Sequence, residues 1–363
     1  MAPSRMLGAG AIVALLAGCS SAAPTTPAAV SAQSTLKTQN AGTVSAAFAS
    51  DAARSFAASR PLPATLRGEF ERAGRQAISH GDTLLFINAN MTGNVYGYDL
   101  NQQSEVWSCT RCGGWGLATD PTSGDIAVGA YDDYSYPIVN VYHVAGTGLS
   151  QYAKLTINTG GTTEPFGLAY DARGNLFASE TPSNSVAEFD RATIRSGSGL
   201  PNHIYMAPDF QSVEYIAVDG KTVVVDGVTA AGEFVAARLE TSGHGGDTIL
   251  NEYGSLQQKT GFPGGLAFDK HHNLIVDNQY GTVKTYAPPW TGQATSTLNW
   301  NYPANDYTAI ALDRRQNELY AADFSSEYDG IGISNPYPLN GVGSLVTYPM
   351  AEIFVGITLT TSN

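Results

Sequence analysis

Acidic side chains recur at one place in a repeated pattern of this chain, near the end of the second apolar run of each repeat. They are Glu180, Asp226, Asp277 and Asp323, and Asn88 holds the same place in an earlier, weaker repeat. Carboxylates that converge can hold a hard divalent cation such as Ca²⁺ or Mg²⁺, which prefers oxygen ligands from flexible loops. The alternative role is structural, because an acidic residue after a strand commonly accepts hydrogen bonds from the backbone of the following turn.

The repeats do not align perfectly at this place. Neighbouring repeats slip by one residue, and such a slip reverses the face of the strand on which a side chain lies. The second repeat has Ala130 instead of a polar residue, which excludes a complete ring of ligands. No cofactor is certain, and a divalent cation site would draw on only some of the repeats.

Two long loops follow the second strand of the second and sixth repeats, and both could add binding groups at the same face. The first loop supplies Tyr131, Tyr134 and Tyr136, and the second supplies Glu327 and Asp329. Long loops on a rigid scaffold often carry binding residues, and aromatic with acidic side chains suit a sugar, a peptide or a cationic group. A packed surface loop without a special role is the alternative.

The elements that would position these groups are short apolar runs in a repeating order. The aspartates that close the first run are Asp120, Asp171, Asp219, Asp269 and Asp313, at steps of 51, 48, 50 and 44 residues. The runs are rich in Val, Ile, Tyr and Phe and are separated by turn-forming residues. Self-similarity at this period indicates a propeller, in which each unit buries its apolar faces against its neighbours. We therefore predict an all-β fold, a six-bladed β-propeller of four-stranded antiparallel blades, over residues 75–363.

The third and fourth runs of each unit give two further expectations. In the third run an apolar residue stands three positions before an aromatic, as in Val95/Tyr98, Val186/Phe189 and Val283/Tyr286. This odd spacing places the two side chains on opposite faces, so that each blade contacts both neighbours. Stretches such as 105–107, 155–157 and 353–357 are expected to supply the fourth strands.

The units resemble NHL-type and related six-bladed propeller repeats, on the strength of residues 167–180 and 265–277. The resemblance covers about four-fifths of the chain and implies the fold. The family includes binding modules, gluconolactonase-like hydrolases and streptogramin lyases, which use a histidine and glutamate set near the channel. That set has no position-by-position match here, and His244 is the one histidine kept as a candidate.

The N-terminal residues resemble a lipoprotein signal peptide over residues 1–18. Arg5 precedes an apolar stretch too short to span a bilayer, and Leu16-Ala-Gly-Cys19 resembles the lipobox in which the cysteine is lipidated. An ordinary secretory signal with a chance cysteine is the alternative. Ser20, where aspartate would signal inner-membrane retention, favours the outer membrane if the organism is diderm. We expect a protein of the cell envelope, bound to the membrane through a lipid on Cys19.

Two segments separate this signal from the propeller. Residues 19–36 have the composition of a flexible tether, and residues 37–74 form an N-terminal segment that could include a short Ala-rich helix.

The formal charge of −13 argues against nucleic acid as a partner. We expect a monomer with a protein or carbohydrate ligand.

Cys109 and Cys112 form an isolated CxxC pair between the first and second units. A disulfide is expected in an exported chain. A free dithiol and a metal site are the alternatives, and the second ligand pair of a zinc site is absent from the sequence.

The sequence thus predicts a lipid-anchored envelope propeller that acts as a binding or scaffolding module for an unidentified ligand. The alternative is a metal-dependent hydrolase or lyase. An enzyme of that kind needs three or more carboxylate, amide or histidine side chains around one point, whereas a module needs a shaped, aromatic-lined surface.

Overall fold

The computed structural model describes the chain in segments that lie between residues 83 and 361. These are residues 83–89, 93–100, 104–109, 112–131, 137–145, 148–157, 163–242, 246–255, 262–279, 282–300, 307–313, 318–323, 331–334, 341–346 and 354–361. The chain divides into two units, 1–38 and 39–363, and every described residue belongs to the second. The predicted signal peptide, tether and N-terminal segment lie outside the described residues.

Antiparallel β-sheets account for nearly all of the described chain, as alternating apolar runs and turn residues require. The first sheet contains, in spatial order, β25 (Phe354–Thr361), β1 (Thr83–Ala89), β2 (Asn94–Asp99) and β3 (Ser104–Cys109). The second contains β4 (Leu117–Thr119), β5 (Ile126–Tyr131), β6 (Pro137–Ala145) and β7 (Gly148–Thr156), with β11 (Ser198–Gly199) added in parallel beside β7.

The next two sheets repeat the same arrangement. The third contains β8 (Glu164–Tyr170), β9 (Leu176–Thr181), β10 (Ser185–Phe189) and β12 (His203–Met206). The fourth contains β13 (Phe210–Asp219), β14 (Thr222–Thr229), β15 (Glu233–Arg238) and β16 (Thr248–Ser255).

The remaining strands form one eight-stranded sheet made of two consecutive four-stranded units. The first unit is β17 (Leu266–Phe268), β18 (Leu274–Asp277), β19 (Thr282–Tyr286) and β20 (Ser296–Trp300). The second unit is β21 (Tyr307–Leu312), β22 (Leu319–Asp323), β23 (Ile331–Ser334) and β24 (Gly341–Val346). Each unit is antiparallel within itself, and the outer strands β20 and β24 pair in parallel and join them.

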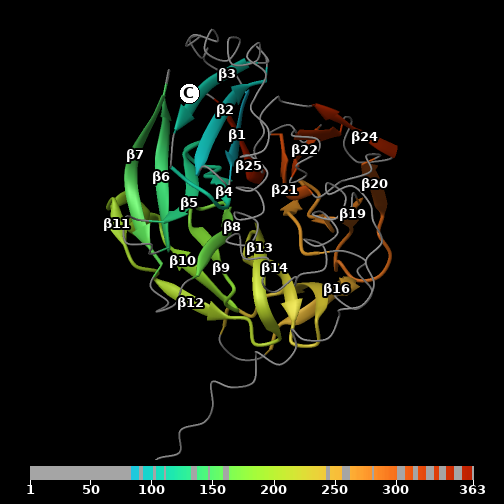
Figure 1. Cartoon of the computed structure of the whole chain (residues 1–363). Helices are drawn as coiled ribbons and strands as arrows, with labels where there is room; N and C mark the ends of the chain where they lie inside the picture. The colour runs from blue at the N-terminus through green and yellow to red at the C-terminus, as the bar shows by residue number, and fades with distance from the viewer. Residues whose placement is uncertain are drawn as a thin grey trace, which may run out of the picture. The chain divides into compact units, whose positions relative to one another are not determined.

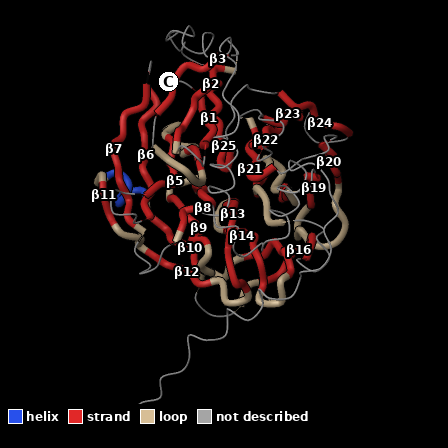
Figure 2. Tube along the Cα trace, in the orientation of Figure 1, coloured by secondary structure: helices blue, strands red, loops and turns tan. Residues whose placement is uncertain are grey.

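A short helix, α4 (Arg191–Arg195), lies at the periphery beside β7 and β11 (Figure 2). It begins at Asp190 because the carboxylate of this residue accepts a hydrogen bond of 2.6 Å from the Thr193 N–H, as an N-cap does. In the described part of the chain, no helix is both long and apolar enough to cross a membrane.

The inner strands of these sheets surround a central channel, as Figure 1 shows. Going round the channel, they are β25, β4, β8, β13, β17 and β21, each in contact with the next, and β21 contacts β25 again. This arrangement confirms the predicted all-β propeller of four-stranded antiparallel sheets. All these strands begin at the face where the second strands of their sheets end, because each inner strand is antiparallel to its neighbour; we call this face the mouth.

The stretch at residues 353–357, expected as a fourth strand of the last unit, has a different place. It contributes to β25, the inner strand of the first sheet, where Ile357 pairs with Ile87 of β1. The physical reason is that β1 needs a partner along its channel edge, and Ile357 is buried in the core there. Residues 75–82, with which the predicted propeller begins, lie outside the described residues.

The core is divided between the facing sides of neighbouring sheets. Val95 and Tyr98 of β2 are both buried but belong to separate apolar clusters, one on each side of the first sheet. The pairs Val186/Phe189 and Val283/Tyr286 are split in the same way. The predicted contact of each blade with both neighbours through its third strand is therefore confirmed for these pairs.

Candidate functional site

Glycine residues let the inner strands approach one another closely around the channel. A Cβ atom on Gly167 of β8 would lie 2.5 Å from the Glu214 carbonyl oxygen of β13. One on Gly265 would lie 2.4 Å from the Ile310 nitrogen of β21. Both distances are far shorter than atoms tolerate, so these positions require glycine and the channel is narrow at this level.

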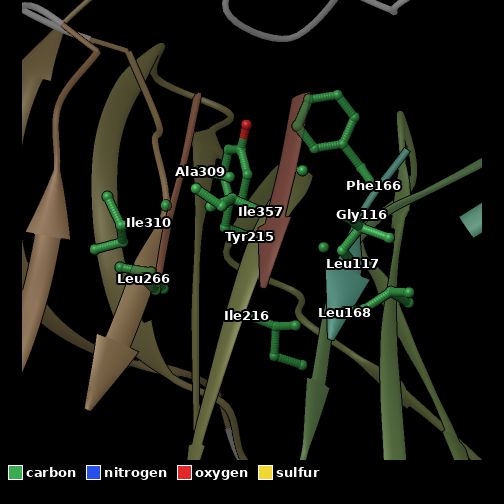
Figure 3. Close-up of a pocket in the computed structure, with 13 residues that line it drawn as sticks. Gly116, Leu117, Phe166, Leu168, Tyr215, Ile216, Leu266, Ala309, Ile310 and Ile357 are labelled. Atoms are coloured by element: carbon green, nitrogen blue, oxygen red, sulfur yellow. The ribbon is translucent and has the colours of Figure 1, made fainter. Parts of the chain in front are cut away.

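The channel encloses a small cavity of about 40 Å³, which has room for about three water molecules. Apolar side chains line it together with backbone atoms of glycine residues. Figure 3 shows the rings of Phe166 and Tyr215 at one end and the side chains of Leu168, Ile216 and Leu266 toward the other. Tyr215 takes the place that Gly116, Gly167, Gly265, Ala309 and Gly356 have in the other inner strands. This tyrosine marks one side of the channel as different from the rest.

A bulge in β13 explains the position of Asp226. The pairing of β13 with β14 shifts between Val213 and Ile216, so the Tyr215 N–H is left outside the regular ladder. Asp226 accepts this N–H at 2.8 Å and the Tyr253 hydroxyl at 2.9 Å, and its side chain is fully buried. Asp226 therefore stabilises β13 at its bulge.

The register of the sheets resolves the one-residue slip among the predicted acidic residues. Asn88, Asp226 and Asp277 each follow the residue that pairs with the Leu or Ile of the channel wall. Glu180 and Asp323 lie one residue later on their strands, so Glu180 faces the opposite side of its sheet. The predicted set therefore divides between two faces and does not form a single cluster.

Two of these residues bond the backbone, and only Asp277 does so in the turn after its strand, as the structural alternative predicted. Asp277 accepts a hydrogen bond of 3.0 Å from the Gln279 N–H in the turn after β18. The Asn88 side-chain amide donates at 2.6 Å to the Trp115 carbonyl of the next sheet. Glu180 is fully buried and accepts a hydrogen bond of 3.4 Å from the Thr163 hydroxyl.

Several predicted residues lie wholly or partly outside the described residues. They are Tyr134, Tyr136, His244, Glu327 and Asp329, together with the side chain of Asp323, whose backbone pairs with Tyr307. Among the described residues, no three His, Cys, Asp or Glu side chains form a group that could hold a metal ion.

The structure does bring Asp226 together with two carboxyl groups that were not predicted, Glu214 of β13 and Glu164 of β8. Burial raises the pKa of Glu214 well above its ordinary value, and the nearby Asp226 and Glu164 raise it further. Burial also raises the pKa of Asp226 to about 8, against the opposing effect of its hydrogen bonds. We call these three residues the acidic cluster.

The three members of the acidic cluster differ in their hydrogen bonding. Asp226 accepts from Tyr215 and Tyr253, and Glu164 accepts from the Tyr131 hydroxyl. Within the described part of the chain, the Glu214 carboxyl receives no hydrogen bond, although its side chain is only 7% exposed. Of the three members, Glu214 is thus the one that receives no hydrogen bond from the described residues.

Aromatic rings form an arc beside the acidic cluster. Tyr131 meets Trp115 edge to face at 6.1 Å between ring centroids, Trp115 lies 5.8 Å from Phe166, and Phe166 lies 5.1 Å from Tyr215. Burial and then the neighbouring Glu164 raise the pKa of Tyr131, which is 40% exposed. The mouth therefore combines these four rings, here called the aromatic arc, with carboxyl groups.

Sequence reasoning identified Asp226 and Tyr131 but missed Glu164, Glu214, Trp115 and Phe166. Trp115 lies just before β4, Glu164 and Phe166 lie in the first three residues of β8, and Glu214 lies in the first half of β13. One signal was available, because Tyr215 departs from the Gly or Ala of the other repeats. A residue at the channel whose type differs from that of its counterparts in the other repeats indicates where a functional site could lie.

The cysteine pair lies at the end of β3 and just beyond it. The sulfur atoms of Cys109 and Cys112 are in contact, and their Cα atoms are 5.7 Å apart. This Cα separation is usual for a disulfide.

Comparison with known proteins supports the fold. No family model matches the chain, and no curated protein matches it. A chain in the crystal structure of a nidogen/laminin complex is similar, with a TM-score of 0.57 and 14% identity over 77% of this chain and 99% of that one. A protein of unknown function from Bacteroides caccae has a TM-score of 0.55 and 10% identity over 77% of this chain and 99% of its own. At these identities the likeness establishes a β-propeller and nothing about activity.

Proposed function

We propose that this protein is a binding module of the cell envelope, which takes its ligand at the mouth of the propeller channel. The observation that carries the proposal is the aromatic arc, which runs from the exposed Tyr131 through Trp115 and Phe166 to Tyr215. Aromatic rings provide large contact areas with little loss of side-chain entropy, and their faces suit sugars, peptides and cationic groups.

The carboxyl groups at the mouth support binding in preference to metal chemistry. Asp226 and Asp277 accept hydrogen bonds from backbone N–H groups, so part of their acceptor capacity serves the scaffold. Among the described residues no three potential ligands gather around one point. The similar chain in the nidogen/laminin complex supports, through the fold alone, the idea that such a propeller can belong to a protein complex.

The remaining features of the proposal come from the sequence. We propose lipidation at Cys19, attachment to the cell envelope through the tether, and the outer membrane as location if the organism is diderm. The cyclic contacts of the inner strands support a count of six blades, with the eight-stranded sheet counted as two. The contact between Cys109 and Cys112 supports a disulfide, and we propose a monomer with a protein or carbohydrate ligand.

A metal-dependent hydrolase or lyase is the second candidate function. The observation that favours it is the raised pKa of Asp226 and of Glu214, since carboxyl groups that remain protonated near neutral pH can act as general acids. This candidate requires Asp323, Glu327 or Asp329 to complete a metal site.

The experiment that separates the candidates measures binding and turnover on the same protein. We expect calorimetry with a panel of oligosaccharides and peptides to find a ligand whose affinity falls about tenfold in Tyr131→Ala, since one cation–π or stacking contact is lost. Tyr152→Ala is the matched control, because Tyr152 is similarly exposed but lies on the outer strand β7. Calcium-dependent hydrolysis of a lactone that disappears in Asp226→Asn would instead support the enzyme.

A further inference from the structure

Within the described parts of the chain, no positively charged side chain is seen to act on the acidic cluster. The pKa of Glu214 is affected by two other carboxyl groups, and no Lys or Arg side chain contributes to it or to that of Asp226. Burying like charges together without a cation is strongly unfavourable, so the cluster must hold protons or receive a positive group from outside. In the free protein the carboxyl groups hold protons taken from the solvent. A cationic ligand can replace these protons.

Glu214 is the member of the cluster that is available to such a group. Asp226 is held by Tyr215 and Tyr253, and Glu164 is held by Tyr131. Glu214 receives no hydrogen bond from the described residues, and 7% of the residue's surface is exposed. A ligand head group can therefore reach its carboxylate and supply the missing donors.

The surroundings of Glu214 fit an organic cation better than a metal ion. No three potential metal ligands gather among the described residues. Phe166 and Tyr215, whose ring centroids are 5.1 Å apart, line the cavity where β8 contacts β13, and Glu214 directly precedes Tyr215 in the chain. An ammonium or guanidinium group brings its own N–H donors and is stabilised by aromatic faces as well as by carboxylates.

We propose that the mouth binds a ligand through a primary ammonium or guanidinium group, which donates hydrogen bonds to Glu214 and lies against Phe166 and Tyr215. This inference rests on the proposed binding function and names the chemical class of its ligand. Phe166 and Tyr215 also line the cavity of about 40 Å³, which has room for a small head group but not for a whole sugar ring.

The test compares an ammonium probe with its neutral isostere on the full chain carrying Cys19→Ala for solubility. We expect propylammonium chloride to raise the melting temperature and to bind in calorimetry, whereas propanol does neither. Glu214→Gln keeps the size of the side chain and removes its charge, so it should weaken propylammonium binding at least tenfold. The same variant should melt at a higher temperature than the parent without any probe, because an uncompensated buried acid is gone.

The controls separate this inference from the proposed function. Glu233→Gln removes an acid from β15, outside the cluster, and should leave propylammonium binding unchanged. Equal propylammonium binding by the parent and by Glu214→Gln, or no binding by the parent, overturns the inference. If a neutral sugar or peptide still binds in a manner that depends on Tyr131, the proposed function stands without it. If no ligand of any class depends on Tyr131, both fail.

Discussion

Replacing Asp226 by Asn removes a buried titrating group with little change in shape. The side-chain oxygen of asparagine can still accept the Tyr215 N–H, which bonds Asp226 at 2.8 Å. Its NH₂ group can donate to the Tyr253 oxygen, which reverses the direction of the 2.9 Å hydrogen bond. The variant therefore isolates the effect of the ionisable proton from that of packing.

The expected magnitude follows from the pKa of Asp226, which burial raises from 3.8 to about 8. Between these two values the folded chain holds a proton that the unfolded chain has released, so the stability of the wild type falls as the pH rises. The fall is about 1.4 kcal/mol per pH unit for one proton, on the order of 6 kcal/mol over the whole window, and it ends above the folded pKa. Glu214, whose pKa is also raised, adds a loss of the same sign in both proteins.

Urea denaturation from about pH 5 to about pH 9 measures this difference. We expect Asp226→Asn to gain stability relative to the wild type by several kcal/mol across this range, with a shallower decline as the pH rises. Asp190→Asn is the control, because the Thr193 N–H lowers the pKa of this exposed N-cap residue and its titration falls below the range. A constant free-energy difference between Asp226→Asn and the wild type at all pH values would refute the raised pKa.

Three further predictions concern the channel, the anchor and the cysteines. Gly167→Ala should destabilise the fold by about 1–3 kcal/mol in urea denaturation, because the new Cβ would lie 2.5 Å from the Glu214 oxygen, and an unchanged midpoint would contradict the close approach of β8 and β13. Cys19→Ala should release the protein into the soluble fraction or leave its signal peptide uncleaved, whereas normal processing with unchanged membrane association would exclude lipidation there. Thiol titration of the denatured, unreduced protein should find no free thiol from Cys109 and Cys112, and two thiols would exclude the disulfide.

The repeat pattern allowed the sheets to be predicted because it depends on local chemistry. Apolar runs, turn residues and the spacing of pairs such as Val95/Tyr98 give the strands and the two buried faces of each blade. The place of residues 354–361 could not be read in this way, because their sequence indicates a strand but not its partner. Only closure of the ring pairs Ile357 with Ile87.

The candidate site was less accessible to sequence reasoning for a related reason. Asp226 was predicted from its repeated position, but the bulge that directs the Tyr215 N–H toward it, where β13 passes close to Gly167, is not visible in the repeat pattern. Glu214 and Glu164 come from different sheets and meet only when β8 and β13 lie side by side. Contacts between repeats decide which acids interact, whereas the repeat itself determines only where acids occur.

The pairing of β25 with β1 has a consequence for biosynthesis. The first sheet contains residues 83–109 and residues 354–361, so it cannot be completed until nearly the whole of this sequence has emerged from the ribosome. Until then β1 presents an unpaired edge, and the ring formed by the inner strands stays open. Such a chain reaches its compact state late. For the export that we propose, this delay is an advantage, because translocation channels thread unfolded polypeptide. Because β25 closes the propeller last, we expect folding to be completed after the proposed translocation across the membrane.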